Sequence, residues 1–257
     1  MMEPIFIDSD NAMGSPYYGD VDDGYGIAAL IRSGLPIAGI GAVHGNTPAR
    51  RAFENNRRLA DHLGYTGPVL PQSEVPDFLR AFHGRVMALG PLTNVAAAIH
   101  EAAFSEVVIV GGNSRTRGRW PPAWPREFNL IIDRSAAREV FRSAVPLTIF
   151  PLNVAGELRL RREDVDVLPD YFRQHTRRWF RYLRYVRMTN RFPIWDLAAA
   201  MYAIEPDAYS MERTTATMRK NTFIEFERGG REVTLCRSFD RQRVWRKFVE
   251  LVGTRSS

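Results

Sequence analysis

The chain has almost no lysine, a single cysteine and no long apolar run, and each shortage excludes something. Lys220 and Lys247 are the two lysines among 35 basic side chains, so 33 are arginines. Schiff-base chemistry and phosphate-loop nucleotide hydrolysis both need a placed lysine, and no GxxxxGK[ST] motif occurs. Cys236 cannot form an internal disulfide, which favours a reducing compartment. Because no apolar run approaches the roughly 20 residues of a membrane span, we expect a soluble, cytoplasmic protein without membrane contact.

The net charge of +6 over 257 residues comes almost wholly from arginine. Arginine binds phosphate and nucleic acid well. Net charge alone is a weak indicator of partners, however, and arginines that only solvate the surface explain the same excess. The composition therefore does not favour nucleic acid as a partner.

Short apolar, β-branched runs alternate with longer helix-like segments, the pattern of βα units in a mostly parallel sheet. We expect strands near residues 4–7, 36–43, 69, 85–90, 106–112 and 146–150, with helices over 22–34, 48–63, 94–102 and 134–144. The last fifty residues differ, because 223–226 and 232–236 alternate around a Gly-Gly pair as a hairpin does, and 241–252 predicts a closing helix. No linker divides the chain. The sequence predicts one Rossmann-like α/β domain over 1–257.

Aspartates gather directly after the first expected strand, where ligands bind in a parallel α/β sheet. Five carboxylates within sixteen residues repel one another unless a cation neutralises them, and hard oxygen ligands of this kind suit Ca²⁺ or Mg²⁺. The alternative is a helix cap, which requires one aspartate rather than five. The five are Asp8, Asp10, Asp20, Asp22 and Asp23.

Asparagines recur at the ends of the other expected strands. Each one alone is typical of a turn or a cap. Their repetition at one edge of the sheet indicates a polar site there. They are Asn46, Asn94, Asn113 and Asn153.

Two later segments add acidic and aromatic side chains. Glu127 and Asn129 occupy alternate positions of a stretch that we expect to be extended, so both can face the same side. Asp196 stands at the head of an apolar helix, directly after Trp195. An N-cap and a core residue are the ordinary alternatives for these two.

Five motifs in this order resemble the nucleoside hydrolases of the inosine-uridine-preferring superfamily, over residues 4 to about 206. A DxD pair alone would be weak, whereas the ordered set is specific. The motifs are Asp8-Ser9-Asp10 with Asp22-Asp23, Gly45-Asn46, the turn from Gly90 to Asn94, Glu127-Phe128-Asn129, and Trp195-Asp196.

The resemblance implies Ca²⁺-dependent hydrolysis of the N-glycosidic bond of ribonucleosides, giving free base and ribose. It implies that Asp10, Asp23, Asp196 and the main-chain carbonyl of Leu89 hold the ion. Asp10 would be the general base toward the Ca²⁺-bound water that attacks the anomeric carbon, because metal binding lowers the pKa of that water. The family also implies a homodimer or homotetramer.

The family's substrate contacts imply how the sugar would be held. Asp22 and Asn46 would bind the 2′- and 3′-hydroxyls, and Glu127 with Asn129 the 3′- and 5′-end. Buried acceptors left unpaired would make deoxyribosides poor substrates. An oxocarbenium-like transition state would be stabilised by an acidic pocket. Further implied contacts are Asn11, Asn113, Trp195 and Arg187.

The chain departs from the family pattern in two places. Asn11–Val21 separates Asp10 from the Asp-Asp pair by eleven residues, an insertion of eight relative to the family. Trp195 replaces a histidine that protonates the leaving base in many members, as in the purine-preferring branch. An indole stacks on a purine but is no general acid, so purines are expected, with Trp120 or Trp124 as a second stacking surface or a surface contact.

One further segment, 171–191, is rich in arginine and aromatics. Arg177, Arg181 and Arg184 fall near one helical face, and would either form a rim that recognises a 5′-phosphate or lie on a solvated amphipathic helix. A non-catalytic riboside-binding protein is another alternative. An aspartate-nucleophile phosphatase is disfavoured because it needs a lysine, and Lys220 and Lys247 lie in the terminal hairpin and helix.

Overall fold

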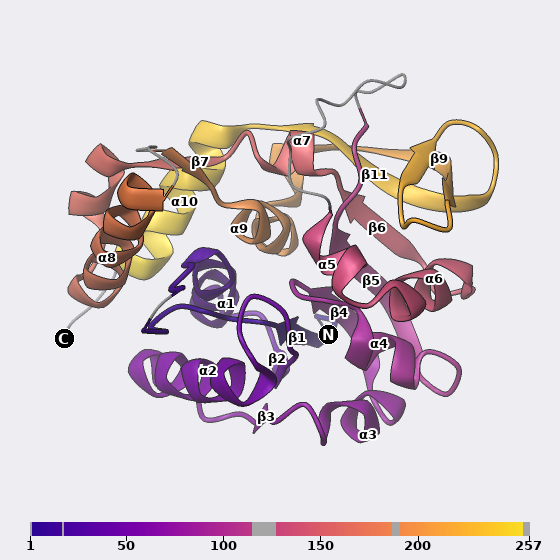
Figure 1. Cartoon of the computed structure of the whole chain (residues 1–257), viewed down its shortest axis with the longest axis horizontal. Helices are drawn as coiled ribbons and strands as arrows, with labels where there is room; N and C mark the ends of the chain where they lie inside the picture. Colours follow the sequence, from indigo (N-terminus) through magenta and orange to yellow (C-terminus); the bar gives the residue numbers. More distant parts are fainter. Residues whose placement is uncertain (1, 17, 115–126, 187–190, 254–257) are drawn as a thin grey trace.

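The computed structural model describes residues 2–16, 18–114, 127–186 and 191–253. Its centre is a sheet of nine strands in the order β10-β9-β11-β6-β5-β4-β1-β2-β3, flanked by helices (Figure 1). All neighbours from β3 to β11 are parallel, and β9 is antiparallel to both β11 and β10. The strands are β1 (Ile5–Ser9), β2 (Ile37–Ala42), β3 (Val69–Leu70), β4 (His83–Ala88), β5 (Ala103–Val110), β6 (Leu147–Phe150), β9 (Tyr209–Met218), β10 (Ile224–Phe226) and β11 (Arg231–Phe239). The mostly parallel α/β fold expected from the sequence is confirmed.

Helices follow most strands, and a small ribbon of β7 (Arg159–Arg161) and β8 (Arg191–Pro193) lies outside the main sheet. No helix in the described ranges is long and apolar enough to cross a membrane. The helices are α1 (Asp22–Arg32), α2 (Ala49–Leu63), α3 (Val75–Arg80), α4 (Thr93–Ala98), α5 (Phe128–Ile132), α6 (Arg134–Arg142), α7 (Leu152–Ala155), α8 (Asp170–Val186), α9 (Trp195–Ala200) and α10 (Arg241–Gly253), with 3-10 helices η1 (Arg162–Val167), η2 (Met201–Ala203) and η3 (Pro206–Ala208).

The central strands are buried on both faces, which explains why they read as continuous apolar runs rather than alternating ones. Every residue of β1 and β6 is buried. Two apolar cores result, one for each face of the sheet. The first contains Tyr25 of α1, Trp179 of α8 and Phe248 of α10, and the second contains residues of α3, α4 and α6.

The C-terminal part differs from the sequence expectation. Segments 223–226 and 232–236 do not pair with each other as a hairpin, because β9 lies between β10 and β11 and pairs with both. The closing helix is confirmed as α10. The segment with Glu127 and Asn129 is also not extended: α5 begins at Phe128, with Glu127 at its N-cap. A helical turn therefore replaces the alternation that was expected to align these two side chains.

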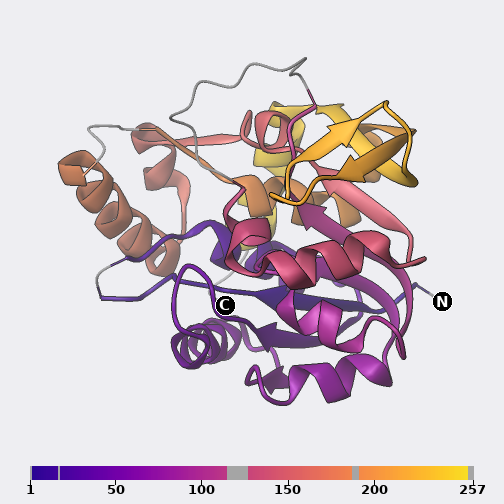
Figure 2. The same cartoon turned by 45° about the vertical axis from the view of Figure 1, so that its right-hand side comes forward.

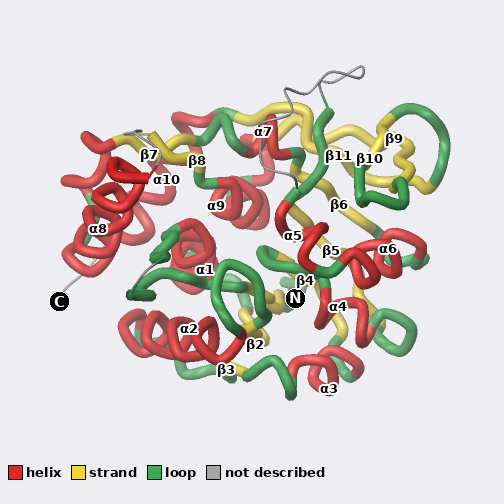
Figure 3. Tube along the Cα trace, in the orientation of Figure 1, coloured by secondary structure: helices red, strands yellow, loops and turns green. Residues whose placement is uncertain are grey.

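The inserted segment after β1 runs beside α1 and α2 and reaches α8 (Figures 2 and 3). On the α2 side, Asn55 Nδ2 donates to the carbonyl of Asn11 at 2.8 Å and to Ser15 Oγ at 3.1 Å. On the α8 side, Arg178 donates to the carbonyl of Pro16 at 2.6 Å. The Tyr18 ring meets Trp179 edge-on, with ring centroids 4.9 Å apart. The described part of the segment thus contacts both α2 and α8.

Candidate active site at the carboxyl edge of the sheet

A pocket of about 420 Å³ opens where the parallel strands end. Its described wall carries four carboxylates, two amides and several apolar or aromatic side chains, and no arginine or lysine among residues 2–16, 18–114, 127–186 and 191–253. The lining residues are Tyr18, Asp20, Asp22, Asn46, Val110, Glu127, Phe128, Asn129, Leu152, Phe192, Trp195 and Asp196.

Asp10 follows β1 and is fully buried behind this wall. Its Oδ2 accepts a hydrogen bond from the backbone N–H of Asn46 at 2.5 Å, whereas its Oδ1 has no partner. Position 45 admits only glycine, because a Cβ there would collide with Asp10 Oδ2. The expected Gly45-Asn46 loop therefore serves to seat the Asp10 carboxylate. Burial raises the pKa of Asp10 from 3.8 to about 6.

Asp23 of α1 and Asp196 of α9 complete the acidic cluster. Both oxygens of Asp23 are buried without a hydrogen-bond partner. Burial is the main cause that raises the pKa of each carboxyl, and repulsion adds to it: Asp10 is the first charge acting on Asp23, and Asp22 the first acting on Asp196. Helices α1 and α9 pack against each other. The fold therefore brings these carboxyls together from distant parts of the sequence.

Asp22 has a structural duty that the sequence did not reveal. Its Oδ2 accepts from Trp195 N at 2.9 Å, and its Oδ1 accepts from Asp196 N at 3.1 Å and Leu197 N at 3.4 Å. The first N–H groups of a helix have no carbonyl partner within the helix, and Asp22 accepts hydrogen bonds from those of α9. Asp22 therefore caps the N-terminus of α9. Although Asp22 also lines the pocket, its first effect is to orient Trp195 and Asp196.

Glu127 and Asn129, the other polar groups named from the sequence, also line the pocket. Asn129 Nδ2 donates to the carbonyl of Leu89 at 2.8 Å, which ties α5 to the end of β4. Glu127 Oε2 is buried without a partner. Burial raises the pKa of Glu127 from 4.5 to about 8, although the Gly112 N–H partly stabilises the charged form.

Asn94 is buried and connects the ends of two strands that lead into the site. Its Nδ2 donates to Asp8 Oδ1 at 2.9 Å and to the carbonyl of Ala42 at 3.0 Å. Asp8 Oδ2 has no partner, and burial raises the pKa of Asp8 to about 7. The turn asparagine expected from the sequence is thus a bridge between the ends of β1 and β2.

Aromatic rings form one side of the pocket. Trp195 Nε1 donates to the carbonyl of Leu152 at 3.1 Å, which fixes the indole plane. Phe192 meets Trp195 edge-on at 5.7 Å and Trp179 at 5.3 Å. Tyr18, on the inserted segment, also lines the pocket. Sequence reasoning missed Phe192 and gave Tyr18 no role of its own; the only signal for Tyr18 was its place in an insertion beside the acidic motif.

Some residues named from the sequence do not line the described pocket. Asn11 is fully buried, with its Oδ1 accepting from Met13 N at 2.9 Å and its Nδ2 without a partner. Asn113 is buried at the end of β5. Arg187, Trp120 and Trp124 lie outside the described residues.

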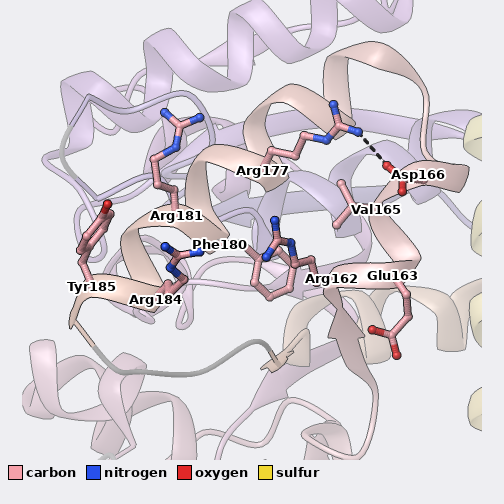
Figure 4. Close-up of a pocket in the computed structure, with 9 residues that line it drawn as sticks. All are labelled: Arg162, Glu163, Val165, Asp166, Arg177, Phe180, Arg181, Arg184 and Tyr185. Atoms are coloured by element: carbon pink, nitrogen blue, oxygen red, sulfur yellow. Dashed lines mark hydrogen bonds and ion pairs between the residues drawn. The ribbon is translucent and has the colours of Figure 1, made fainter.

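The expected arginine face exists on α8 but does not border this pocket. Arg177, Arg181 and Arg184 line a separate groove together with Arg162 of η1, called here the arginine groove (Figure 4). The face of α8 that contacts the inserted segment instead carries Arg178, Trp179 and Tyr182. The described arginines of α8 therefore do not form a rim at the mouth of the carboxylate pocket.

The resemblance to the nucleoside hydrolases implies a divalent ion, and the buried carboxylate oxygens have the chemistry that such an ion requires. Within the described ranges, no three His, Cys, Asp or Glu side chains are already drawn into a formed metal cage. The donors nevertheless suit a hard cation, because Asp10 Oδ1 and both oxygens of Asp23 are buried, unpartnered and close to other carboxyls. The carboxylates of Asp10 and Asp23 therefore fit a hard divalent cation such as Ca²⁺.

The fold and this pocket define an α/β protein with a carboxylate-lined pocket at the carboxyl edge of its sheet, the edge where ligands bind in folds of this type. The chain belongs to the inosine-uridine preferring nucleoside hydrolase family, whose model matches residues 75–246. The resemblance read from the motifs is thereby confirmed. Members of this family generally use a divalent metal, commonly calcium. The matched range contains Leu89, Glu127, Asn129 and Asp196, and the aspartates after β1 precede it.

Relatives and solved structures agree with the family. The pyrimidine-specific ribonucleoside hydrolase RihA of Shewanella woodyi is 33% identical over 159 residues, covering 54% of this chain and 48% of RihA. RihA of Photobacterium profundum is 31% identical over 152 residues, covering 52% of this chain and 47% of that protein. The chain spans about half the length of the curated relatives it matches.

Solved structures show the same fold across nearly the whole chain. A plant nucleoside hydrolase, PpNRh1, superposes with a TM-score of 0.81 at 18% identity, covering 99% of this chain and 100% of that one. A purine-preferring ribonucleoside hydrolase from Gardnerella vaginalis gives a TM-score of 0.75 at 15% identity, covering 98% of both chains. At these identities the likeness concerns the fold alone.

Proposed function

We propose that the protein hydrolyses the N-glycosidic bond of ribonucleosides, preferentially of purines, with Ca²⁺. The observation that carries the proposal is the set of buried carboxylate oxygens without partners, on Asp10 and Asp23, behind a pocket of nucleoside size. Buried polar groups are normally satisfied. Because no protein group donates a hydrogen bond to these oxygens, we infer that they bind a ligand.

Asp10 is the proposed general base. Its Oδ2 is held by the Asn46 N–H, so its Oδ1 remains to accept a proton from the attacking water. As the purine or pyrimidine leaving group departs, positive charge develops on the ribose ring. The pocket wall, with Asp20, Asp22 and Asp196, favours that charge over a neutral substrate.

The cation is proposed to be held by Asp10, Asp23, Asp196 and the Leu89 carbonyl. A bound Ca²⁺ would lower the pKa of a coordinated water and offset the mutual repulsion of the carboxylates. The protein's own part is to fix the donors: Asn129 anchors Leu89, and Asp22 sets the start of α9. Asn46 and Glu127, both in the wall, are proposed to bind the sugar.

Purine preference is proposed from the aromatic side of the pocket. Trp195 and Phe192 are large flat surfaces for a stacked base, and neither can donate a proton as an acid near neutral pH. The relatives' names include both pyrimidine-specific and purine-preferring enzymes. Arg187, outside the described ranges, is proposed to help the base depart, and Trp120 or Trp124 to provide either a second stacking surface or a surface contact.

A 5′-phosphate is not the favoured substituent. The described wall contains no arginine or lysine that could bind a phosphate, and its four carboxylates would repel one. We therefore propose a nucleoside with a free 5′-hydroxyl. A non-catalytic riboside-binding protein would bind the same ligands without releasing base.

One panel tests the function. Inosine, guanosine, uridine, 2′-deoxyinosine and inosine 5′-monophosphate are incubated with the full chain, and free base is measured by chromatography. Purine ribosides should release base fastest, and EDTA should abolish release. Asp10→Asn should lower kcat by about 10³-fold while riboside binding persists, whereas Asp61→Asn, on the exposed side of α2, should change neither. Activity retained in EDTA would exclude the Ca²⁺ mechanism, and binding without base release by the wild-type chain would favour the non-catalytic alternative.

We also propose a cytoplasmic assembly of two or four copies. Phe128 and Ile132 of α5 are 44% and 40% exposed and offer an apolar surface near the pocket. Light scattering during size-exclusion chromatography measures the mass directly. A monomer at micromolar concentration would contradict the assembly.

A further inference from the structure

The arginine groove is a second cavity, with a volume of about 930 Å³, between η1 and α8. It shares no lining residue with the carboxylate pocket. Its floor is apolar, formed by buried Val165 and Phe180. The remaining lining residues are Arg162, Glu163, Asp166, Arg177, Arg181, Arg184 and Tyr185.

The groove carries uncompensated positive charge. Its two carboxylates already have partners: Asp166 pairs with Arg177 at 2.7 Å, and Glu163 with Arg161 at 3.6 Å. The guanidinium groups of Arg162, Arg181 and Arg184 form no ion pair with any described residue, whereas Arg177 is paired with Asp166. Like charges gathered in one groove repel one another. An anion bound there would relieve that repulsion.

The placement of the arginines defines the shape of the anion. Arg177, Arg181 and Arg184 lie at positions i, i+4 and i+7 of α8, so they share one face over about 10 Å of the helix. Arg162 approaches from η1, and in the view of Figure 4 it and Arg184 extend toward Phe180, while Arg177 turns to Asp166. The unpaired groups are therefore supplied by two elements, and in the same view Arg181 extends away from Arg162 and Arg184 along the groove lining.

A guanidinium presents a planar pair of N–H donors that fits phosphate oxygens. A single phosphate engages one or two such groups, whereas several linked phosphates reach all three. We propose that the arginine groove binds an oligophosphate chain, inorganic or belonging to a nucleoside triphosphate, through Arg162, Arg181 and Arg184. Tyr185, which follows Arg184 in α8 and lines the groove, is 75% exposed and available to stack on a base.

Two other occupants fit less well. A second copy of this groove would bring unpaired arginines against one another, which opposes a symmetric contact. A long nucleic acid strand would extend beyond the groove past Asp164 of η1, whose carboxylate accepts only from the Arg161 backbone N–H among the described residues and would repel phosphate. A short and highly charged ligand matches the groove better.

Titration calorimetry on the full chain at low salt tests the proposal with inorganic triphosphate, ATP, AMP and a uridine-oligomer RNA as probes. The variants are Arg181→Gln with Arg184→Gln, and separately Arg162→Gln on the opposite element. The matched control is Arg241→Gln with Arg246→Gln, which removes the same charge from exposed, unpaired positions of α10. Thermal melts of each variant confirm that it folds, and Arg162→Gln keeps the test valid if the double variant does not.

We expect saturable binding of triphosphate at one site, much weaker binding of AMP, a loss of affinity of about tenfold or more in both groove variants, and no change in the control. Equal affinity for triphosphate and ATP would assign an inorganic chain. Tighter binding of ATP, lost in Tyr185→Ala, would assign the nucleotide. Absence of saturable binding, an equal loss in the α10 control, AMP binding as well as ATP, or RNA binding more tightly than triphosphate would each overturn the proposal.

Discussion

Glu127 offers a sharp test of how the pocket wall is built. Its carboxyl is buried with one oxygen unpartnered, and burial raises its pKa from 4.5 to about 8. The folded protein therefore keeps this proton between pH 4.5 and 8, whereas the unfolded chain loses it. Folding stability must fall as the pH rises through that window, and the contribution of Glu127 levels off above pH 8. A rise of this size corresponds to an upper limit of about 5 kcal/mol.

Glu127→Gln removes the titration while keeping the side chain's size and an oxygen that can accept from the Gly112 N–H. Urea unfolding in EDTA, measured from pH 4.5 to 8.5, should show similar stability of variant and wild type at the acidic end. The variant should gain progressively toward pH 8.5, by up to about 5 kcal/mol. Glu232→Gln, on the exposed side of β11, is the matched control and should show no such trend. A gap that is constant with pH, or that favours the wild type at pH 8.5, would refute a buried neutral Glu127.

Three further outcomes follow from the site. Ca²⁺ at about 100 times its Kd should raise the unfolding free energy of the wild type and of Asp61→Asn by about 2.7 kcal/mol in thermal melts, and an equal gain in Asp23→Asn would remove Asp23 from the ion site. Asn94→Ala should cost about 2–3 kcal/mol in urea unfolding, because two buried oxygens lose their donor; a cost near zero would contradict that bridge. Tyr18→Ala should raise KM for inosine several-fold with kcat retained, whereas Tyr185→Ala should leave KM unchanged, and equal KM values in the two variants would exclude Tyr18 from substrate binding.

The parallel part of the fold could be predicted because its strands are buried on both faces. Such strands are continuous apolar runs, and turn residues separate them from the helices. β9 could not be predicted in the same way. Its ten residues from Tyr209 to Met218 are mostly exposed or half-buried and include Glu212, Arg213 and three threonines, so no apolar run marks the strand. Its place between β10 and β11 follows from pairing across the sheet, which local alternation does not encode.

The site was predictable where chemistry is carried by short motifs. Asp10, Asp23 and Asp196 each follow a recognisable signal, and the fold gathers all three around one edge. The roles of Asp22 and Phe192 depend on contacts between α1, α9 and β8 that are far apart in the sequence. Likewise, the sequence predicted an extended stretch at Glu127, whereas the short helix α5 begins directly after it, at Phe128.

The distribution of charge links the two cavities. Six aspartates of the site are buried, at Asp8, Asp10, Asp20, Asp22, Asp23 and Asp196, in a chain with 33 arginines. A single guanidinium placed in the described wall would pair with these carboxylates as a bound cation would, and would thereby occupy the space of the ribose. The absence of arginine from the described wall leaves these carboxylates without ion pairs there, as the proposed cation and riboside require. Arg162, Arg181 and Arg184, which form no ion pair with any described residue, carry the proposed phosphate site. The two proposed ligands therefore differ in charge, one cavity taking a cation with a neutral riboside and the other an anion.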